Sequence, residues 1–285
     1  MTDAPSWFTA ALAIAPDVSQ TTVDGTSISF RTWGSPGASR DLLLVHGGAA
    51  HARWWDFIAP LLAVGRRVVA VDMSGHGDSG HRAAYSVDLW ADELVAVIEA
   101  GGLGPHPVIA AHSLGGMVST ILAGRGDPQL GGLIVIDSPV EPNGLAPRTE
   151  ADNTFGKARV YPNEVSAVER FRPIPAQSTL PYAAEYIATN SVRAVEGGWS
   201  WKFDPAFVTM TGDFPQTMDG LTCPAVYIAG ERGILSPAGR AALDASSDVA
   251  VVEIPDAGHA MMLDRPVALV SALRGVLAGW QTTAP

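Results

Sequence analysis

A serine in a predicted tight turn is the first candidate for chemistry in this sequence. Ser113 follows the apolar run 108–111, which predicts a buried strand, and precedes residues 117–123, which predict a helix. Gly115 and Gly116 lie between them, so strand and helix can approach each other closely. Such a turn would expose Ser113 at the carboxyl edge of a parallel sheet, where α/β folds bind ligands. The alternative is that Ser113 only caps the helix.

A base and an oxyanion site are needed if Ser113 is a nucleophile, because a serine hydroxyl is weakly nucleophilic at its ordinary pKa. His259 follows the predicted strand 249–254, which would bring it to the same sheet edge. Backbone N–H groups of Leu114 and of Gly48, in the turn after the first central strand, could bind an oxyanion. Ala49 is the alternative to Gly48. Together these residues predict nucleophilic acyl chemistry.

Composition limits the class of protein. The chain has 285 residues, is 47% hydrophobic and 16% charged, and can therefore bury a sizeable core. Its net charge of −11 argues against nucleic acid or an anionic membrane as the main partner. We see no signal peptide, no membrane-spanning run and no zinc-binding pattern around the single Cys223. We expect a cytoplasmic protein, and the oligomeric state stays open.

The order of predicted elements indicates an α/β fold. Apolar strand-like runs alternate with helical segments, which predicts a doubly wound, mostly parallel sheet. A hairpin at 19–32, turning at Asp24 and Gly25, precedes them. The predicted strands cover residues 42–45, 67–72, 108–111, 133–137, 225–229 and 249–254, and the main helices cover 55–64, 87–100 and 266–280.

Residues 141–211 interrupt this alternation. They contain no clear buried strand and many aromatic residues and prolines. Because a structureless loop of this length is implausible in a compact domain, we expect a mainly helical cap over the sheet edge. The predicted core therefore consists of residues 1–140 and 212–285.

Four motifs together resemble the α/β-hydrolase family, of the capped serine hydrolase or esterase type. They are residues 46–48, 75–79, the turn at Ser113 and residues 258–259, although Ala111 replaces the usual first glycine of that turn. The resemblance implies Ser113 as nucleophile and His259 as base. Residues 75–80 also fit a dinucleotide-binding pattern, but no helix follows them directly, so we do not favour it.

The resemblance implies hydrolysis of a carboxylic ester, lactone or related acyl substrate through an acyl-enzyme, without a metal or organic cofactor. The aromatic cap suggests a small-molecule substrate with an apolar or aromatic group. Two alternatives stay open, a cofactor-free dioxygenase or C–C hydrolase and a non-catalytic ligand-binding receptor. We expect His112 to point away from the pocket, whereas other side chains line it or simply pack: His51, Trp54, Trp55, Trp199, Trp201 and Met261.

The acid that should orient His259 departs from the family pattern. Most relatives place it three residues after the glycine that ends the strand following the cap; here this glycine is Gly230, and position 233 is another glycine. Glu231, in the same loop, is one substitute. Asp137 is the other, resembling haloalkane dehalogenases and some cofactor-free dioxygenases, although it could merely cap a turn. We predict that Asp137 binds one ring nitrogen of His259 while the other faces Ser113.

Overall fold

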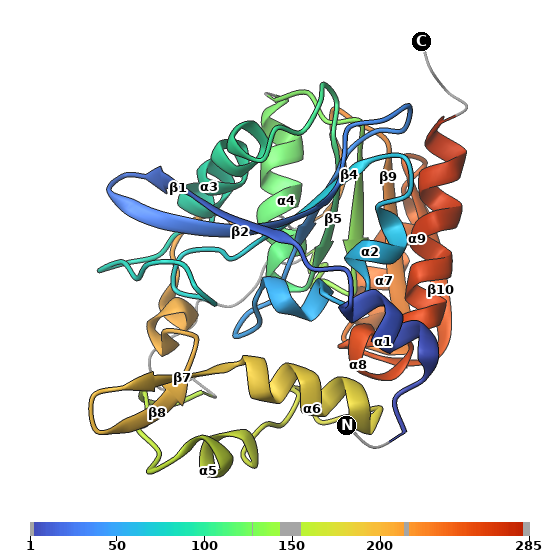
Figure 1. The fold of residues 1–285 in the computed structure, drawn as a ribbon. Helices are drawn as coiled ribbons and strands as arrows, with labels where there is room; N and C mark the ends of the chain where they lie inside the picture. Colours follow the sequence, from blue (N-terminus) through green and yellow to red (C-terminus); the bar gives the residue numbers. More distant parts are fainter. Residues whose placement is uncertain (1–2, 127, 143–154, 214–216, 282–285) are drawn as a thin grey trace.

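An eight-stranded sheet runs through the computed structural model, which describes residues 3–126, 128–142, 155–213 and 217–281 (Figure 1). Its strand order is β1-β2-β4-β3-β5-β6-β9-β10. The strands are β1 (Asp17–Val23), β2 (Thr26–Gly34), β3 (Leu42–Val45), β4 (Arg67–Val71), β5 (Val108–His112), β6 (Gly132–Ile136), β9 (Ala225–Arg232) and β10 (Val249–Gly258).

Strands β4, β3, β5, β6, β9 and β10 are parallel, whereas β1 and β2 form an antiparallel hairpin that joins the sheet beside β4. The predicted doubly wound, mostly parallel sheet is thereby confirmed. The chain leaves β3 toward β4 and returns on the other side of β3 as β5. Such a reversal opens a crevice at the carboxyl ends of the strands, the usual ligand site of α/β sheets. The turn after β3 and Ser113 after β5 both face this crevice.

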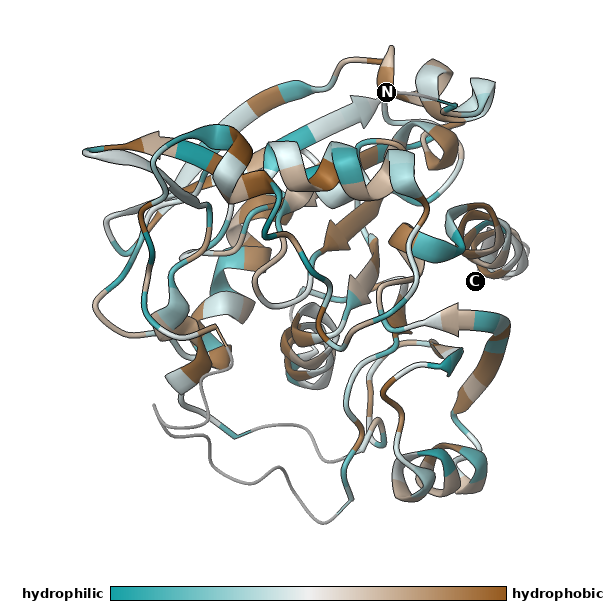
Figure 2. Ribbon diagram, turned by 90° about the horizontal axis from the view of Figure 1, so that it is seen from below, coloured by the Kyte–Doolittle hydropathy of each residue, from teal (hydrophilic) through white to brown (hydrophobic). Residues whose placement is uncertain are grey.

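Helices cover both faces of the sheet. Helices α1 (Ser6–Leu12), α2 (Ala59–Leu62) and α9 (Pro266–Gln281) pack on one face, and α3 (Val87–Ala100), α4 (Leu114–Arg125) and α7 (Pro237–Ala245) pack on the other. Strands β3, β5 and β6 are buried at every position, as expected for a sheet covered on both faces. Viewed from below, the central strands are mostly hydrophobic, whereas the surrounding helices mix both kinds of residue (Figure 2). No helix of the described residues is long and apolar enough to cross a membrane.

Residues 155–213 form a layer below the sheet in Figure 1. This layer contains α5 (Glu164–Val168), α6 (Pro181–Asn190), the hairpin of β7 (Val192–Val195) and β8 (Gly198–Trp201), and the 3-10 helix η3 (Pro205–Thr209). We expected no buried strand and a mainly helical segment here, and the short hairpin is an element that this expectation did not include. Its strands are only four residues long and mostly half-buried, so they lack the continuous apolar run that predicts a buried strand. The predicted cap residues 143–154 lie outside the described part of the chain.

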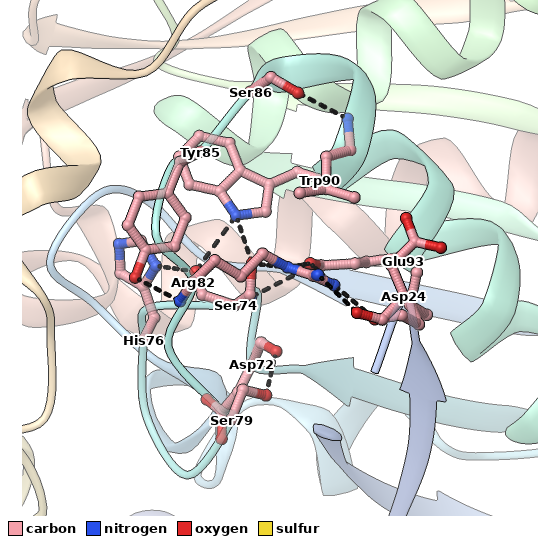
Figure 3. A network of polar contacts seen from close by, with 12 residues as sticks. Asp24, Asp72, Ser74, His76, Ser79, Arg82, Tyr85, Ser86, Trp90 and Glu93 are labelled. Atoms are coloured by element: carbon pink, nitrogen blue, oxygen red, sulfur yellow. Dashed lines mark hydrogen bonds and ion pairs between the residues drawn. The ribbon is translucent and has the colours of Figure 1, made fainter. Parts of the chain in front are cut away.

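The loop at 75–80 is braced by its own polar contacts (Figure 3). Ser79 Oγ donates to the Asp72 carbonyl at 2.6 Å, and the Asp72 carboxylate accepts the N–H of Asp78 at 3.0 Å. A Cβ at Gly77 would overlap that carboxylate, so the glycine serves close packing. Burial raises the pKa of Asp72 to about 6. The loop therefore has a structural explanation that involves no dinucleotide.

Candidate active site

The turn at Ser113 is strained and closely packed. Ser113 has φ 51° and ψ −119°, a conformation that L-residues rarely adopt and that clusters at functional sites. Its N–H donates to the Ile136 carbonyl at 3.0 Å, and its carbonyl accepts the Ser138 hydroxyl at 2.7 Å. A Cβ at Gly115 would lie 2.5 Å from the His46 carbonyl oxygen, and one at Gly116 2.8 Å from Ser138 Cβ. Both glycines are therefore required for α4 to pass the sheet at this distance.

Ser113, His259 and Asp137 form a continuous hydrogen-bonded chain. The Nε2 atom of His259 lies 3.1 Å from Ser113 Oγ, and its Nδ1 atom lies 2.8 Å from Asp137 Oδ2. Asp137 is fully buried, and the His259 side chain is 8% exposed. Because an ionised carboxylate only accepts hydrogen bonds, this contact assigns the ring proton to Nδ1. The lone pair of Nε2 then faces the serine hydroxyl, as a general base requires.

Two backbone N–H groups hold the Asp137 carboxylate in place. Oδ1 accepts the N–H of Gly230 at 3.1 Å, and Oδ2 accepts that of Ile234 at 2.9 Å. Both donors come from the end of β9 and its following loop, where most family members carry the acid. A Cβ at Gly233 would overlap the Asp137 carboxylate. The glycine at the usual position of the acid thus leaves the space that Asp137 fills from the neighbouring strand.

Glu231, the other candidate acid, points elsewhere. Its Oε2 atom accepts the N–H of Asp256 at 2.6 Å, and both residues are exposed near the ends of β9 and β10. No hydrogen bond joins it to His259 in the described part of the chain. The geometry therefore favours Asp137 as the partner of the imidazole.

The loop that carries His259 is held by a residue that the sequence patterns do not identify. Gln177 accepts the N–H of Ala260 at 2.8 Å and donates to the Ala260 carbonyl at 3.2 Å and to Asp264 Oδ2 at 3.1 Å. Asp264 also accepts the N–H of Gly258 at 2.7 Å. A single polar residue in a segment without periodicity carries no sequence signal for this role. Gln177 links residues 155–213 directly to the loop that carries His259.

Two backbone regions offer candidate oxyanion donors, the turn after β3 and the start of α4. Among the described residues, the N–H groups of Gly48, of the alternative Ala49 and of Leu114 have no hydrogen-bond partner, and both Gly48 and Ala49 line the cavity beside Ser113. His46 donates from Nδ1 to the Gly47 carbonyl at 2.7 Å and accepts the N–H of Met73 on Nε2 at 3.1 Å. Burial lowers the pKa of His46 to about 4, so it stays neutral and braces the turn.

A cavity of about 310 Å³ opens at Ser113 and His259. Trp54 and Trp201 line it as expected. His112 also lines it, and its ring centroid lies 4.6 Å from that of His259, so our expectation that it points away is wrong. His112 turns inward because its Nε2 donates to the His259 carbonyl at 2.9 Å.

Four other expected pocket residues do not line the cavity. Trp55 and Met261 are fully buried in the hydrophobic core, where apolar packing explains them. His51 is buried behind the wall and bonds through Nε2 to the hydroxyl of Ser191, which does line the cavity. Trp199 lies two residues nearer the turn of the β7–β8 hairpin than Trp201, beyond the cavity. The described residues contain no cluster of His, Cys, Asp and Glu that could hold a metal ion.

Comparison with known proteins gives one family. A model described as the alpha/beta hydrolase family matches residues 42–273. An esterase of Mycobacterium tuberculosis is 27% identical over 270 residues, covering 90% of this chain and 88% of that protein. An sn-1-specific diacylglycerol lipase of Mus musculus is 26% identical over 226 residues, covering 75% of this chain and 72% of that protein. The crystal structure of a hypothetical protein of Pseudomonas aeruginosa matches with a TM-score of 0.76 and 25% identity, covering 93% of this chain and 99% of that chain.

Proposed function

We propose a reaction for this chain, which belongs to the alpha/beta hydrolase family. It hydrolyses carboxylic esters or related acyl compounds such as lactones. The observation that carries the proposal is the hydrogen-bonded chain from Ser113 Oγ through His259 to Asp137. Relatives named as an esterase and a lipase support ester hydrolysis at the general level.

The first half of the proposed reaction forms an acyl-enzyme. Ser113 Oγ attacks the ester carbonyl carbon while His259 Nε2 accepts the hydroxyl proton. Asp137 stabilises the resulting imidazolium through its bond to Nδ1. The N–H groups of Leu114 and Gly48 donate to the tetrahedral oxyanion. When the intermediate collapses, His259 returns the proton to the departing alcohol.

The second half releases the acid. His259 removes a proton from a water molecule, whose oxygen attacks the acyl carbon. The same oxyanion donors stabilise the second tetrahedral intermediate. Its collapse breaks the bond to Ser113 Oγ, which recovers its proton from His259. Every proton transfer uses the same ring nitrogen, which explains why the His259 tautomer must be held by a carboxylate.

In the proposed cap, residues 141–211, several of the described residues supply the outer wall of the cavity. Phe171 and Trp201 from this segment line the cavity together with Trp54 of the 3-10 helix η1 (Ala52–Trp55). Their ring centroids are 6.2 Å apart for Trp54 and Phe171 and 6.3 Å apart for Phe171 and Trp201. These aromatic contacts support a small-molecule substrate with an apolar or aromatic group.

Substitution of the nucleophile tests the proposal. Ser113→Ala should lower kcat for 4-nitrophenyl acetate by at least about a thousandfold without changing Tm. An organophosphonate should label the parent protein and not the variant. Turnover within tenfold of the parent would remove Ser113 from the mechanism, and ligand binding without turnover by the parent would instead indicate a receptor.

A further inference from the structure

The outer part of the cavity gathers positive charge in an acidic protein. Four lining residues carry a full positive charge, and the described residues that line the cavity include no aspartate or glutamate. The chain as a whole has 29 acidic against 18 Lys and Arg residues, so a random lining would favour negative charge. We call the four residues the basic rim: Lys157, Arg159, Arg170 and Arg172.

The basic rim flanks the aromatic wall. Phe171 contacts the rings of Trp54 and Trp201, and its two chain neighbours, Arg170 and Arg172, belong to the rim. Arg172 Nη1 donates to the Glu169 carbonyl at 3.0 Å and to the Phe171 carbonyl at 2.6 Å. These carbonyls hold one end of the guanidinium near the end of α5, and no described residue accepts a hydrogen bond from its other N–H groups.

The rim charges are not neutralised by the described protein residues. No ion pair joins any of the four to a described aspartate or glutamate. Elsewhere on the surface, Arg125 pairs with Asp88 at 2.7 Å, Arg240 with Asp244 at 3.0 Å and Lys202 with Asp78 at 2.8 Å. Toward the described residues, the rim therefore lacks the acidic partners that Arg125, Arg240 and Lys202 have.

These observations divide the cavity into three zones. Ser113 and His259 lie at the inner end, the aromatic rings line its wall, and the basic rim lies where the side chains are exposed. We propose that the enzyme selects acyl esters whose far end carries an anionic group, a carboxylate or a phosphate, separated from the ester carbonyl by an apolar spacer. The inference rests on the proposed ester hydrolysis and adds its substrate class.

A matched pair of substrates tests it. The mono-4-nitrophenyl ester of suberic acid and 4-nitrophenyl octanoate have the same spacer length and differ by a terminal carboxylate in place of a methyl group. The parent enzyme should show a kcat/KM about five- to tenfold higher for the suberate ester at low salt, and added salt should reduce this ratio. A phosphonate-ended ester of the same length distinguishes phosphate from carboxylate preference.

Variants then assign the preference to the rim. The ratio of kcat/KM between the suberate and octanoate esters should fall close to one in Arg170→Gln/Arg172→Gln and decrease in Lys157→Gln/Arg159→Gln. Arg240→Gln removes one exposed charge far from the cavity and should leave both the ratio and the basal activity unchanged. An unchanged ratio in both rim variants, or a parent enzyme without preference for the suberate ester, would overturn the inference.

A binding measurement separates this inference from the proposed function. Calorimetry should show that suberate binds the parent protein more tightly than octanoate, and that the double variants lose this difference. Failure of ester hydrolysis with suberate binding intact would contradict only the proposed function. Hydrolysis of the octanoate ester without preference for either suberate compound would contradict only the anionic substrate class.

Discussion

The two sides of the cavity hold their side chains by different means. On the sheet side, Ser113 and Asp137 sit at the ends of buried strands, have positive φ values and are fixed by several hydrogen bonds. On the side formed by residues 155–213, the rings of Phe171 and Trp201 lie 6.3 Å apart, and the rim cations are exposed. This difference matches the roles that we propose, catalysis for the sheet side and substrate recognition for the other side.

Chemistry and recognition tolerate different amounts of motion. Proton transfer and attack on a carbonyl need reacting atoms held within a fraction of an ångström, and backbone strain at Ser113 is compatible with such fixation. Recognition of an apolar spacer and an anion depends on contact area and charge, which longer and more mobile side chains can supply. Substitutions on the sheet side should therefore lower kcat for every ester, whereas those on the other side should change KM and substrate preference.

Asp137→Asn should lower activity more than any change to the loop after β9 or to the aromatic wall. An amide cannot stabilise the imidazolium and favours the wrong tautomer, so kcat for 4-nitrophenyl acetate should fall about ten-thousandfold. Glu231→Gln is the matched control, because it alters the other candidate acid, and it should change kcat less than about twofold. A larger loss in Glu231→Gln than in Asp137→Asn would reverse the assignment of the acid.

Gly233→Ala should cause the second-largest loss of kcat. The added Cβ overlaps the Asp137 carboxylate, so the carboxylate must shift away from His259, and kcat should fall about ten- to a hundredfold. Gly124→Ala in α4 is the control, since a Cβ there meets no atom within 4 Å. Steady-state kinetics and Tm measured on both variants check the prediction. A kcat within twofold of the parent in Gly233→Ala would mean that the loop after β9 can move without disturbing Asp137.

Of these three substitutions, Trp201→Ala should have the smallest effect on activity, and it should change KM rather than kcat. Loss of one aromatic wall residue should raise KM for 4-nitrophenyl octanoate about three- to tenfold and change KM for the acetate ester less. Trp199→Ala offers a comparison within the same hairpin, because Trp199 does not line the cavity. Equal effects of both variants on both esters, together with a lowered Tm, would make these tryptophans ordinary packing residues.

Local patterns in the sequence were enough to predict the sheet and to place the candidate base at its edge. Strands β3, β5 and β6 are buried on both faces, and their continuous apolar runs therefore stand out from the surrounding sequence. The range 87–100 predicted α3, and Ser86, directly before it, caps the helix by accepting the Leu89 N–H on its hydroxyl at 3.1 Å. Ser113 and His259 were predictable because both follow strands of one parallel sheet, whose carboxyl ends share an edge.

The partners of these residues depended on the tertiary structure. Asp137 and Gly233 are far apart in the sequence, and only the pairing of β6 with β9 shows that one fills the space left by the other. The role of Gln177 and the gathering of the basic rim likewise depend on how residues 155–213 fold against the sheet edge. The periodicity of a sequence indicates which face of a helix or strand is buried. Contacts between distant segments depend on tertiary packing, and no periodic pattern in the sequence indicates them.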